Sequence, residues 1–392
     1  MRRHNYEVAL DGKPSPTART SSLHTQGSSP CALRKNTPVR SGGLSLIPHR
    51  ETLVAFLMLL PFAVLLVRVQ HALCAHASNG IFNSFLQGQL GPVFSSRILM
   101  RLLIPGVWSL APHAWFPEHA NQLLQIGFTG IGLIATYELA RSWLSATAAL
   151  GVSYLAGAWL AWGMLPMGYS FAYPYDLPTF AFSALGLLAL ARRDLWGFAG
   201  MVFFGVLCKE TIVWLLVVVA IMEWRRRGML FGWWVFSGLV LLAIVCYALP
   251  RLGFLGSRLY PFATVELWEN KEAKITRVAA NIREFGTLAH GSPTENIYWF
   301  ATIFLPVVFV WRHGLSPFLR ACWMGALVLF TGNFICGNVW EVRIFNEIVP
   351  LGAVTTFLAF RLVVEGGVEA APTDFPPLSS VAEPPYPDTT RK

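Results

Sequence analysis

The sequence predicts an all-α protein, a polytopic transmembrane helical bundle with a disordered tail at each end. Three observations lead to this fold class. Of the 392 residues 54% are hydrophobic and only 13% are charged, whereas soluble domains carry about 25% charged residues. Apolar runs follow one another from residue 51 to residue 363. The basic residues, which give a net charge of +9, lie in short loops and in the N-terminal tail. This distribution sets membrane orientation and excludes a nucleic-acid-binding stripe.

The chain divides into a basic tail, a membrane domain and a proline-rich tail. Residues 1–50 are rich in Ser, Pro, Arg and Gly and lack apolar periodicity, which predicts a disordered basic cytoplasmic tail. Residues 364–392 contain many prolines, and we expect a second disordered tail there. Residues 51–363 form the predicted transmembrane domain. Its first apolar run, Leu53–Val69, has no small-residue cleavage site after it, so we expect a signal anchor.

About ten helical membrane segments are predicted within this domain. They cover roughly residues 53–69, 123–140, 144–164, 176–191, 195–208, 212–224, 229–249, 297–311, 319–336 and 345–363. Residues 97–116 are amphipathic and interrupted by two prolines, so we expect this stretch to lie along the outer membrane interface. Residues 250–296 form the one long outer loop. The expected protein is multi-pass, and the lipid bilayer is its first partner.

Lys209 and Glu210 interrupt an otherwise nearly uncharged run, residues 195–224. Ionisable residues at membrane depth are costly and usually face a cavity, a partner or a substrate. The short segments on either side form either a hairpin with its tip on the outer side, or one long helix with the pair at its centre. We favour the hairpin, because a single helix would place Arg192-Arg193 and Arg225–Arg227 on opposite sides of the membrane. With the hairpin, both termini are cytoplasmic.

Under this topology four separate parts of the chain bring polar side chains to the outer face. The candidate site residues are Arg97, Arg101, Asp176, Lys209, Glu210, Glu341, Arg343, Asn346 and Glu347, and the first outer loop adds His71, His76, Asn79, Asn83 and Gln87. Charged residues from distant parts of a membrane chain are costly to gather without a ligand. Their convergence therefore predicts a functional cavity.

Several of these residues also have a purely structural interpretation. Asp176 is placed to be the N-cap of the helix that follows it. Lys209 can extend to the membrane interface while Glu210 pairs with it. Glu341 and Arg343 can form a solvated loop pair of little energetic value. These alternatives stay open at the level of the sequence.

Three further patterns favour structural roles. Glu138 and Arg141, three residues apart, predict an ion pair at the end of a helix. Tyr173 and Tyr175 are typical of the aromatic belt at a membrane interface. The stretch 71–76 contains two histidines and a cysteine, but it has no evident fourth ligand for a metal site.

Three stretches of the membrane domain together resemble a known group of proteins. They are Tyr175-Asp176-Leu177-Pro178 before an apolar helix ending in Arg192-Arg193, then Lys209-Glu210-Thr211 after a short apolar arm, then Glu341-x-Arg343-Ile344-Phe345-Asn346-Glu347-x-x-Pro350. The pattern, over residues 50–363, is similar to that of bacterial multi-pass membrane proteins that loosely resemble the C-type glycosyltransferase superfamily. Members of that superfamily take sugars from polyprenyl-phosphate carriers at the outer face. The resemblance implies a location in the plasma (inner) membrane.

The resemblance also implies a glycosyltransferase-like enzyme that uses a lipid-phosphate-linked sugar. Asp176 or Glu210 would be the catalytic base. The substrate-binding residues would be Lys209, Arg343, Glu341, Glu347, Arg97 and Arg101. Cations or a divalent metal would stabilise the leaving phosphate oxygen. Residues 70–117 contain no Asp or Glu, a departure from the superfamily, whose members carry an essential acid in the first outer loop. A transporter or flippase and a non-enzymatic membrane assembly protein are the alternatives.

Overall fold

The structure, a computed structural model, describes residues 50–74, 82–83, 85–87, 97–112, 115–164, 173–254, 278, 281–282, 294–311, 315–336 and 342–364. All of them belong to one unit, Pro48–Lys392. Apart from one residue each, the two predicted tails lie outside the described residues, as does most of the predicted outer loop. Every regular element in the described part of the chain is a helix, and none is a strand. The predicted all-α class is therefore confirmed.

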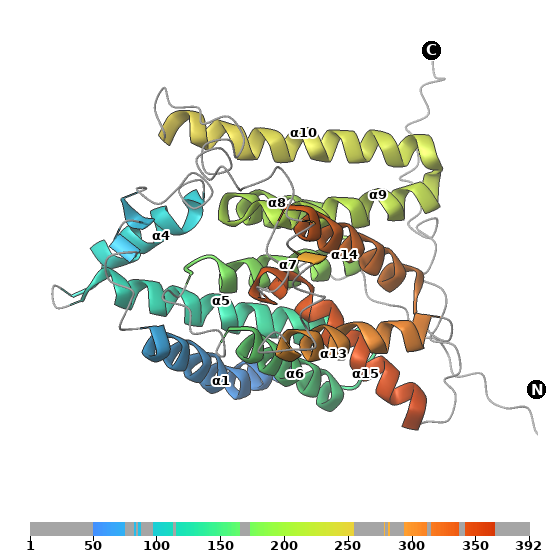
Figure 1. The fold of residues 1–392 in the computed structure, drawn as a ribbon, viewed down its shortest axis with the longest axis horizontal. Coiled ribbons are helices and arrows are strands. Elements are labelled where there is room, and N and C mark those ends of the chain that lie inside the picture. Colours follow the sequence, from blue (N-terminus) through green and yellow to red (C-terminus); the bar gives the residue numbers. More distant parts are fainter. Residues whose placement is uncertain are drawn as a thin grey trace, which may run out of the picture. The chain divides into compact units, whose positions relative to one another are not determined.

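The described helices coincide with the predicted apolar segments (Figure 1). In chain order they are α1 (Arg50–Cys74), α4 (Ile98–Ser109), α5 (Pro117–Ala140), α6 (Ala146–Met164), α7 (Asp176–Ala191), α8 (Leu195–Cys208), the 3₁₀ helix η1 (Glu210–Val213), α9 (Trp214–Arg227), α10 (Met229–Phe254), α13 (Thr294–Trp311), α14 (Pro317–Cys336), the 3₁₀ helix η3 (Val342–Ile348) and α15 (Val349–Val364). The bounds of α7 and α8 are the predicted ones. Helix α4 occupies the amphipathic stretch between the first two apolar segments.

Four stretches are helical, apolar and long enough to cross a membrane: Arg50–Cys74, Pro117–Ala140, Pro317–Ile335 and Arg343–Val364. Shorter apolar helices accompany them, α7 and α8 among them. The protein is therefore a membrane protein built from transmembrane helices. A span needs about 20 apolar residues at 1.5 Å each. The sequence predicts about ten crossings, but in the described chain only these four stretches have the required length and hydropathy.

Three helix termini meet at one end of this unit. The first turn of α1 contacts the last turn of α5, where Thr52 donates a hydrogen bond to Glu138 (2.6 Å) and Glu51 forms an ion pair with Arg141 (2.9 Å). Arg192, at the C-terminus of α7, bonds to the other carboxylate oxygen of Glu138 (2.7 Å). The pairing of Glu138 with Arg141 predicted from the sequence is wrong, because tertiary contacts give each residue a partner from another helix.

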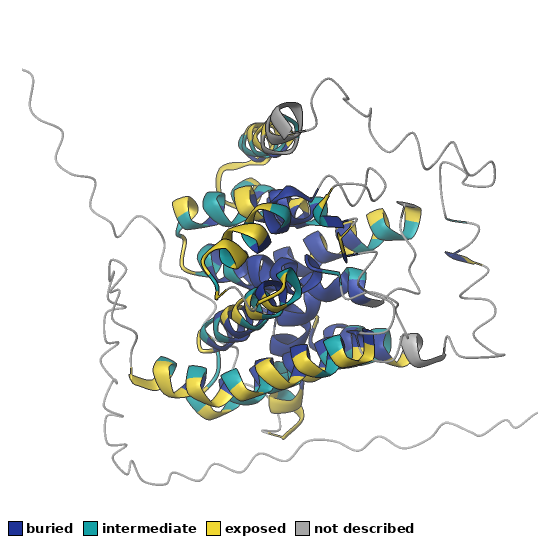
Figure 2. Ribbon diagram, turned by 90° about the vertical axis from the view of Figure 1, so that its left-hand side faces the viewer, coloured by how far each residue is buried: buried dark blue, intermediate teal, exposed yellow. Residues whose placement is uncertain are grey.

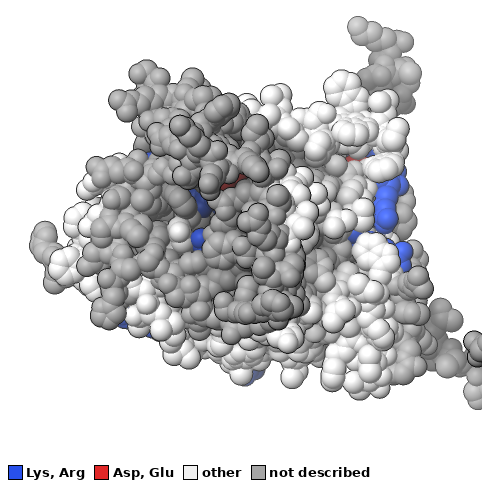
Figure 3. Space-filling view, in the orientation of Figure 1, with Lys and Arg blue, Asp and Glu red and all other residues white. Residues whose placement is uncertain are grey.

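Two further helices end on the same side of this unit. Arg361, in the last turn of α15, donates a hydrogen bond to the carbonyl of Trp143, just after α5 (3.4 Å). Helix α9 ends in three arginines and reverses into α10 at Gly228, whose φ of 94° favours glycine. Figure 1 draws this junction on the right, the side on which α15 ends, and Figure 3 shows Lys and Arg side chains gathered there. We call this part the basic end; its members are Arg141, Arg192, Arg193, Arg225, Arg226, Arg227 and Arg361.

Exposed tryptophans accompany the arginines of the basic end. Trp196 in the first turn of α8 is 90% exposed, and Trp233 and Trp234 near the start of α10 are 60% and 72% exposed. Tryptophan is enriched where a protein meets the boundary between lipid and water, and arginine flanks membrane helices. The basic end therefore has the composition of a membrane surface, from which the apolar helices extend.

Helix α7 is the most enclosed of the described α-helices. Thirteen of its sixteen residues are buried, so it is surrounded on all sides. It packs against α5, α8 and η3. Gly132 of α5 makes the close approach feasible, since a Cβ atom there would overlap the ring of Phe180. Figure 2 shows the buried residues concentrated at the centre, while exposed residues lie on the outer faces of the peripheral helices.

The helical path breaks at Lys209, between α8 and α9. Lys209 has an extended backbone (φ −159°, ψ 132°), and η1 follows before α9 begins. Gly205 allows the break to close, because the side chain of Ile212 packs where a Cβ of residue 205 would lie. Helix α8 packs mainly on α7 and also contacts α10, whereas α9 packs mainly on α10 and α14. The predicted interruption by Lys209 and Glu210 is thus present, and the two arms differ in their main neighbours.

Candidate functional site

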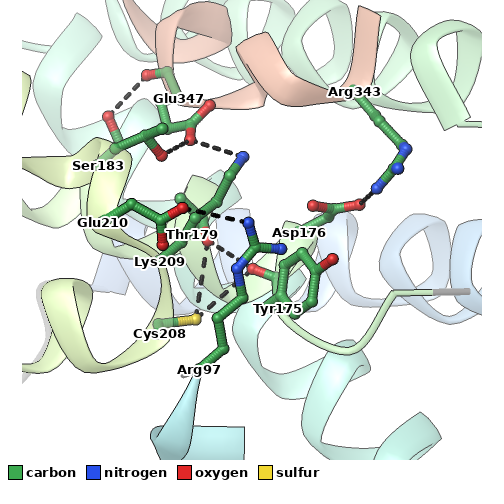
Figure 4. Close-up of polar contacts among 11 residues, drawn as sticks. Arg97, Tyr175, Asp176, Thr179, Ser183, Cys208, Lys209, Glu210, Arg343 and Glu347 are labelled. Atoms are coloured by element: carbon green, nitrogen blue, oxygen red, sulfur yellow. Dashed lines mark hydrogen bonds and ion pairs between the residues drawn. The ribbon is translucent and has the colours of Figure 1, made fainter. Parts of the chain in front are cut away.

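Six charged side chains from four distant parts of the chain converge beside the break at Lys209 (Figure 4). We call them the charge cluster; its members are Arg97, Asp176, Lys209, Glu210, Arg343 and Glu347. Arg97 precedes α4, Asp176 begins α7, and Lys209 and Glu210 lie between α8 and α9. The last two members lie in η3. Three cations meet three carboxylates, so the formal charges cancel.

Asp176 and Arg343 form the first ion pair of the cluster. The Arg343 Nη1 atom lies 2.9 Å from Asp176 Oδ2, and the side chains are 8% and 2% exposed. The guanidinium also stacks on the ring of Tyr173, 3.8 Å from its centroid. Asp176 is the first residue of α7 and Tyr175 is the N-cap. The interpretation of Asp176 as an N-cap is therefore wrong, because its carboxylate bonds to η3 instead.

Lys209 and Glu347 form the second ion pair, which is the most deeply buried. The Lys209 Nζ atom lies 2.9 Å from Glu347 Oε1, and the side chains are 4% and 0% exposed. The hydroxyl of Thr211 donates a hydrogen bond to the same oxygen. Ser183 of α7 donates to the main-chain carbonyl of Glu347 (2.6 Å). These contacts attach η3 to both α7 and the break between α8 and α9.

Arg97 and Glu210 form the third pair, with Arg97 Nη2 3.4 Å from Glu210 Oε1. The guanidinium of Arg97 stacks on Tyr175 at 3.8 Å from the ring centroid. The Glu210 side chain is 41% exposed, far more than the other two carboxylates. Burial raises the pKa of Glu210, but the Arg97 charge, a main-chain hydrogen bond and the Lys209 charge lower it more. The pKa of Glu210 therefore lies below its usual range, and the carboxylate is ionised at neutral pH.

The extended conformation of Lys209 explains how two adjacent residues of opposite charge acquire different partners. Successive side chains of an extended chain point to opposite faces. Lys209 accordingly reaches Glu347, while Glu210 reaches Arg97 (Figure 4). The interpretation in which Lys209 extends to the interface and pairs with Glu210 is wrong on both counts, because Lys209 is buried and each residue pairs elsewhere.

A network around Tyr175 connects the three pairs. Its main-chain carbonyl accepts hydrogen bonds from Thr179 (2.5 Å) and from the thiol of Cys208 (3.6 Å). Cys208 immediately precedes Lys209, and Tyr175 immediately precedes Asp176. Because Arg97 stacks on the ring of the same tyrosine, the start of α7, the end of α8 and the residue before α4 meet at one point.

Each carboxylate of the cluster keeps one oxygen without a hydrogen bond in the described part of the chain. These atoms are Asp176 Oδ1, Glu210 Oε2 and Glu347 Oε2, and all three are buried. Both polar atoms of the Asn346 side chain, which is fully buried, likewise have no partner among the described residues. Unsatisfied buried polar atoms are rare and each needs a reason, such as a catalytic role or a bound ligand. The carboxylates of the cluster can therefore accept further hydrogen bonds in addition to the ion pairs that they form within it.

The cluster is recessed relative to the length of a membrane crossing. Helices α7 and α8 have 16 and 14 residues and connect the cluster with the basic end, so they cover about 24 and 21 Å. The hydrocarbon core of a bilayer is about 30 Å thick. The charge cluster lies at the ends of α7 and α8 that are distant from the basic end. A helix that crossed the whole hydrocarbon core from the basic end would therefore extend beyond the cluster.

Of the eight residues predicted to be catalytic or substrate-binding, six belong to the charge cluster and two do not. Arg101 lies in α4 and donates a hydrogen bond to the carbonyl of Leu86 (3.5 Å). Glu341 lies outside the described residues, so its predicted pairing with Arg343 is not tested. His76 and Asn79 also lie outside them. Across the described ranges, no three His, Cys, Asp or Glu side chains are grouped so as to hold a metal ion.

Several residues of the site were not predicted to take part. Tyr173 and Tyr175 resemble interface aromatics in the sequence, but each ring supports a buried guanidinium. Thr211, Ser183 and Cys208 have no sequence signal beyond adjacency to charged residues or position on an apolar helix. The sequence signal for the tyrosines was their position within the three residues before Asp176.

No family model matches this chain, and it matches no curated protein and no solved structure.

Proposed function

We propose that this protein is a membrane-embedded glycosyltransferase-like enzyme that uses a lipid-phosphate-linked sugar. One observation carries the proposal. Each carboxylate of the charge cluster has one oxygen held by a cation and a second, buried oxygen without a hydrogen bond in the described part of the chain. A carboxylate fixed in this way can accept a proton from a bound hydroxyl, and the adjacent cations can stabilise a phosphate.

Glu210 is the best-placed catalytic base in this proposal. It is the most exposed of the three carboxylates, and its lowered pKa keeps it ionised. In the transfer, the acceptor oxygen forms a bond to the anomeric carbon of the sugar while the acceptor proton goes to Glu210. The bond from the anomeric carbon to the phosphate oxygen breaks, and its electron pair leaves with the polyprenyl phosphate. Asp176, the other predicted base, is 2% exposed and holds Arg343 in place.

The arginines of the cluster suit the phosphate of the carrier. Arg97 and Arg343 each stack one face on a tyrosine ring, which fixes the plane of the guanidinium and leaves its donors directed along that plane. Guanidinium groups bind phosphate through such planar donor pairs. Lys209 adds a third cation, and a divalent metal recruited with the substrate is the alternative source of positive charge.

Helix α4 provides a route for the apolar carrier chain. It begins beside Arg97 and exposes Leu102 and Trp108, and Leu110 just after it is 89% exposed. An exposed apolar helix next to a buried charge cluster allows a lipid tail to remain in the membrane while its phosphate reaches the cations. This arrangement supports a lipid-linked substrate over a water-soluble sugar nucleotide.

The proposed orientation places the basic end in the cytoplasm of a bacterial cell and the charge cluster toward the outer face of the plasma (inner) membrane. Arginine-rich ends of membrane helices favour the cytoplasmic side. The α1 N-terminus and the α15 C-terminus both lie at the basic end, which supports two cytoplasmic termini. About ten membrane segments, some of them short and enclosed by protein, are compatible with this arrangement.

The proposal is tested with the purified full-length protein in nanodiscs. Short-chain polyprenyl-phosphate hexoses and pentoses with a radiolabelled sugar are supplied, and release of polyprenyl phosphate and transfer of label are measured, with and without EDTA. The wild type should release polyprenyl phosphate, and Glu210→Gln should reduce the rate by roughly 10²–10⁴-fold. Glu138→Gln, at the basic end, is the matched control and should retain the rate. If none of the carrier-linked sugars leads to release of polyprenyl phosphate, the proposed enzyme activity is refuted.

A transporter or flippase is the second candidate, and the break between α8 and α9 favours it. Transporters commonly bind substrate where membrane helices are interrupted and charged residues lie in the gap. In vesicles containing the protein, a fluorescent polyprenyl-phosphate sugar would then change leaflet without losing its sugar. If neither transfer nor translocation occurs, the charge cluster acts in membrane assembly, as internal pairing alone would allow.

A further inference from the structure

A groove opens at the basic end between α6 and α15, far along both helices from the charge cluster. It has a volume of about 410 Å³ and its lining includes Ser145, Ala148, Phe357, Phe360 and Arg361. This volume falls within the range of about 300–1,000 Å³ that is typical of ligand sites. Nothing in the proposed enzyme reaction uses this groove.

The two polar residues of the groove lining, Ser145 and Arg361, both lie at its surface end, where the apolar Leu144 and Val364 accompany them. Helix α6 begins at the basic end and α15 finishes there, so Ser145 and Arg361 lie at the level of the arginines and exposed tryptophans. Ala148 and Phe357 lie about one helical turn deeper along their helices. A molecule in the groove would therefore meet a hydroxyl and a cation at the membrane surface, and apolar side chains along the whole groove.

Close packing one turn deeper gives the groove a floor. A Cβ atom on Gly151 of α6 would lie only 2.8 Å from the ring of Phe357, so the two helices touch there. One turn nearer the surface, the small side chain of Ala148 faces the groove. The groove therefore exists because small residues of α6 lie opposite phenylalanines of α15. A large side chain at position 148 would fill the groove.

We propose that this groove binds a bilayer phospholipid with an anionic headgroup. The headgroup phosphate would lie at Arg361 and Ser145, and an acyl chain would lie along Ala148, Phe357 and Phe360. Charge complementarity selects the headgroup, because Arg361 is exposed at the mouth of the groove and arginine attracts anionic lipid at a membrane surface. The N-terminus of α6 adds partial positive charge at the same place.

The apolar part of the lining selects a lipid over a soluble anion. Phe360 is 65% exposed in this structure, and an acyl chain would cover it without removing it from the membrane. A free phosphate ion would contact Arg361 and Ser145 but none of the apolar side chains that make up the rest of the lining. The site is thus an amphipathic groove at the depth where a phospholipid changes from headgroup to chain.

Lipid binding is tested on the full-length protein, purified in detergent until delipidated and then mixed with phosphatidylglycerol or phosphatidylcholine of identical acyl chains. Native mass spectrometry counts retained lipids, and thermal unfolding reports stabilisation. The wild type should retain one phosphatidylglycerol in preference to phosphatidylcholine. Arg361→Gln should weaken that preference about fivefold, and Ala148→Trp should remove the bound lipid while leaving the arginine in place.

Arg226→Gln is the matched control, since Arg226 is an exposed arginine of the basic end outside the groove. It should retain the preference of the wild type. Equal loss in Arg226→Gln and Arg361→Gln would mean that the lipid responds to the overall charge of the basic end, and would overturn the site. Equal retention of both lipids by the wild type would overturn the headgroup assignment. Unchanged retention in Ala148→Trp, with the protein still monodisperse, would place the lipid elsewhere.

Discussion

Lys209 and Glu347 form a buried ion pair that connects the break between α8 and α9 to the 3₁₀ helix before α15. The nitrogen and oxygen are 2.9 Å apart, and the side chains are 4% and 0% exposed. Thr211 donates a hydrogen bond to the same carboxylate oxygen. Two stretches far apart in the sequence are thereby held together in a region from which water is largely excluded.

Removing one partner of this pair should destabilise the protein far more than removing both. Glu347→Leu leaves the Lys209 ammonium buried without its carboxylate, which typically costs about 3–5 kcal/mol. The double variant Lys209→Met/Glu347→Leu has no unpaired charge and should recover most of that loss. Unfolding in mixed detergent micelles, with all four proteins in one double-mutant cycle, measures the coupling. If the losses of the two single variants simply add in the double variant, the two residues do not interact.

The break at Lys209 should depend on the glycine at position 205. Gly205→Ala introduces a Cβ atom 2.8 Å from Ile212, and overpacking of this kind costs about 1–3 kcal/mol. Ile212→Ala removes both Cγ atoms that this Cβ would meet, so Gly205→Ala should cost less in the Ile212→Ala background than in the wild type. Gly200→Ala in the same helix is the control, because nothing lies within 4 Å of its Cβ position. Thermal unfolding distinguishes them, and equal melting temperatures for Gly205→Ala and Gly200→Ala would contradict the packing.

The contribution of the Arg97–Glu210 pair to stability should decrease in acid. The pKa of Glu210 is lower in the folded protein than in the unfolded chain. The stabilisation is therefore fully present above the unfolded pKa and is lost as the pH falls through the folded pKa. With Glu210 41% exposed, the difference between wild type and Glu210→Gln should be below about 1 kcal/mol at neutral pH and should vanish in acid. A difference that grows in acid would reverse the sign of the interaction.

Cysteines introduced at the ends of the described helices should each react with an impermeant reagent from one predicted side of the membrane. In a cysteine-free background, Glu51→Cys, Arg226→Cys and Arg361→Cys should react with an impermeant maleimide from one side, because all three residues lie at the basic end. His119→Cys, near the start of α5, should react from the other side, since α5 is long enough to cross. Labelling of Glu51→Cys and His119→Cys from the same side would rule out a crossing by α5.

Local sequence patterns were sufficient to locate the helices. The bounds of α7 and α8 agree with those predicted, because apolar runs ended by charged or conformationally special residues define helices through short-range interactions alone. The same patterns identified the membrane class and the interruption at Lys209 and Glu210. They also indicated the six residues of the charge cluster, since ionisable groups among apolar residues are conspicuous in any membrane sequence.

The choice of partners was decided only in the tertiary structure. The sequence suggested Glu138 with Arg141 and Glu210 with Lys209, because residues near in sequence are the only neighbours that helical periodicity can identify. The folded chain pairs Glu138 with Arg192 and Glu210 with Arg97. Among cations and carboxylates of similar chemistry, only the packing of α7 against its neighbours and the extended turn at Lys209 determine which charges come within bonding distance.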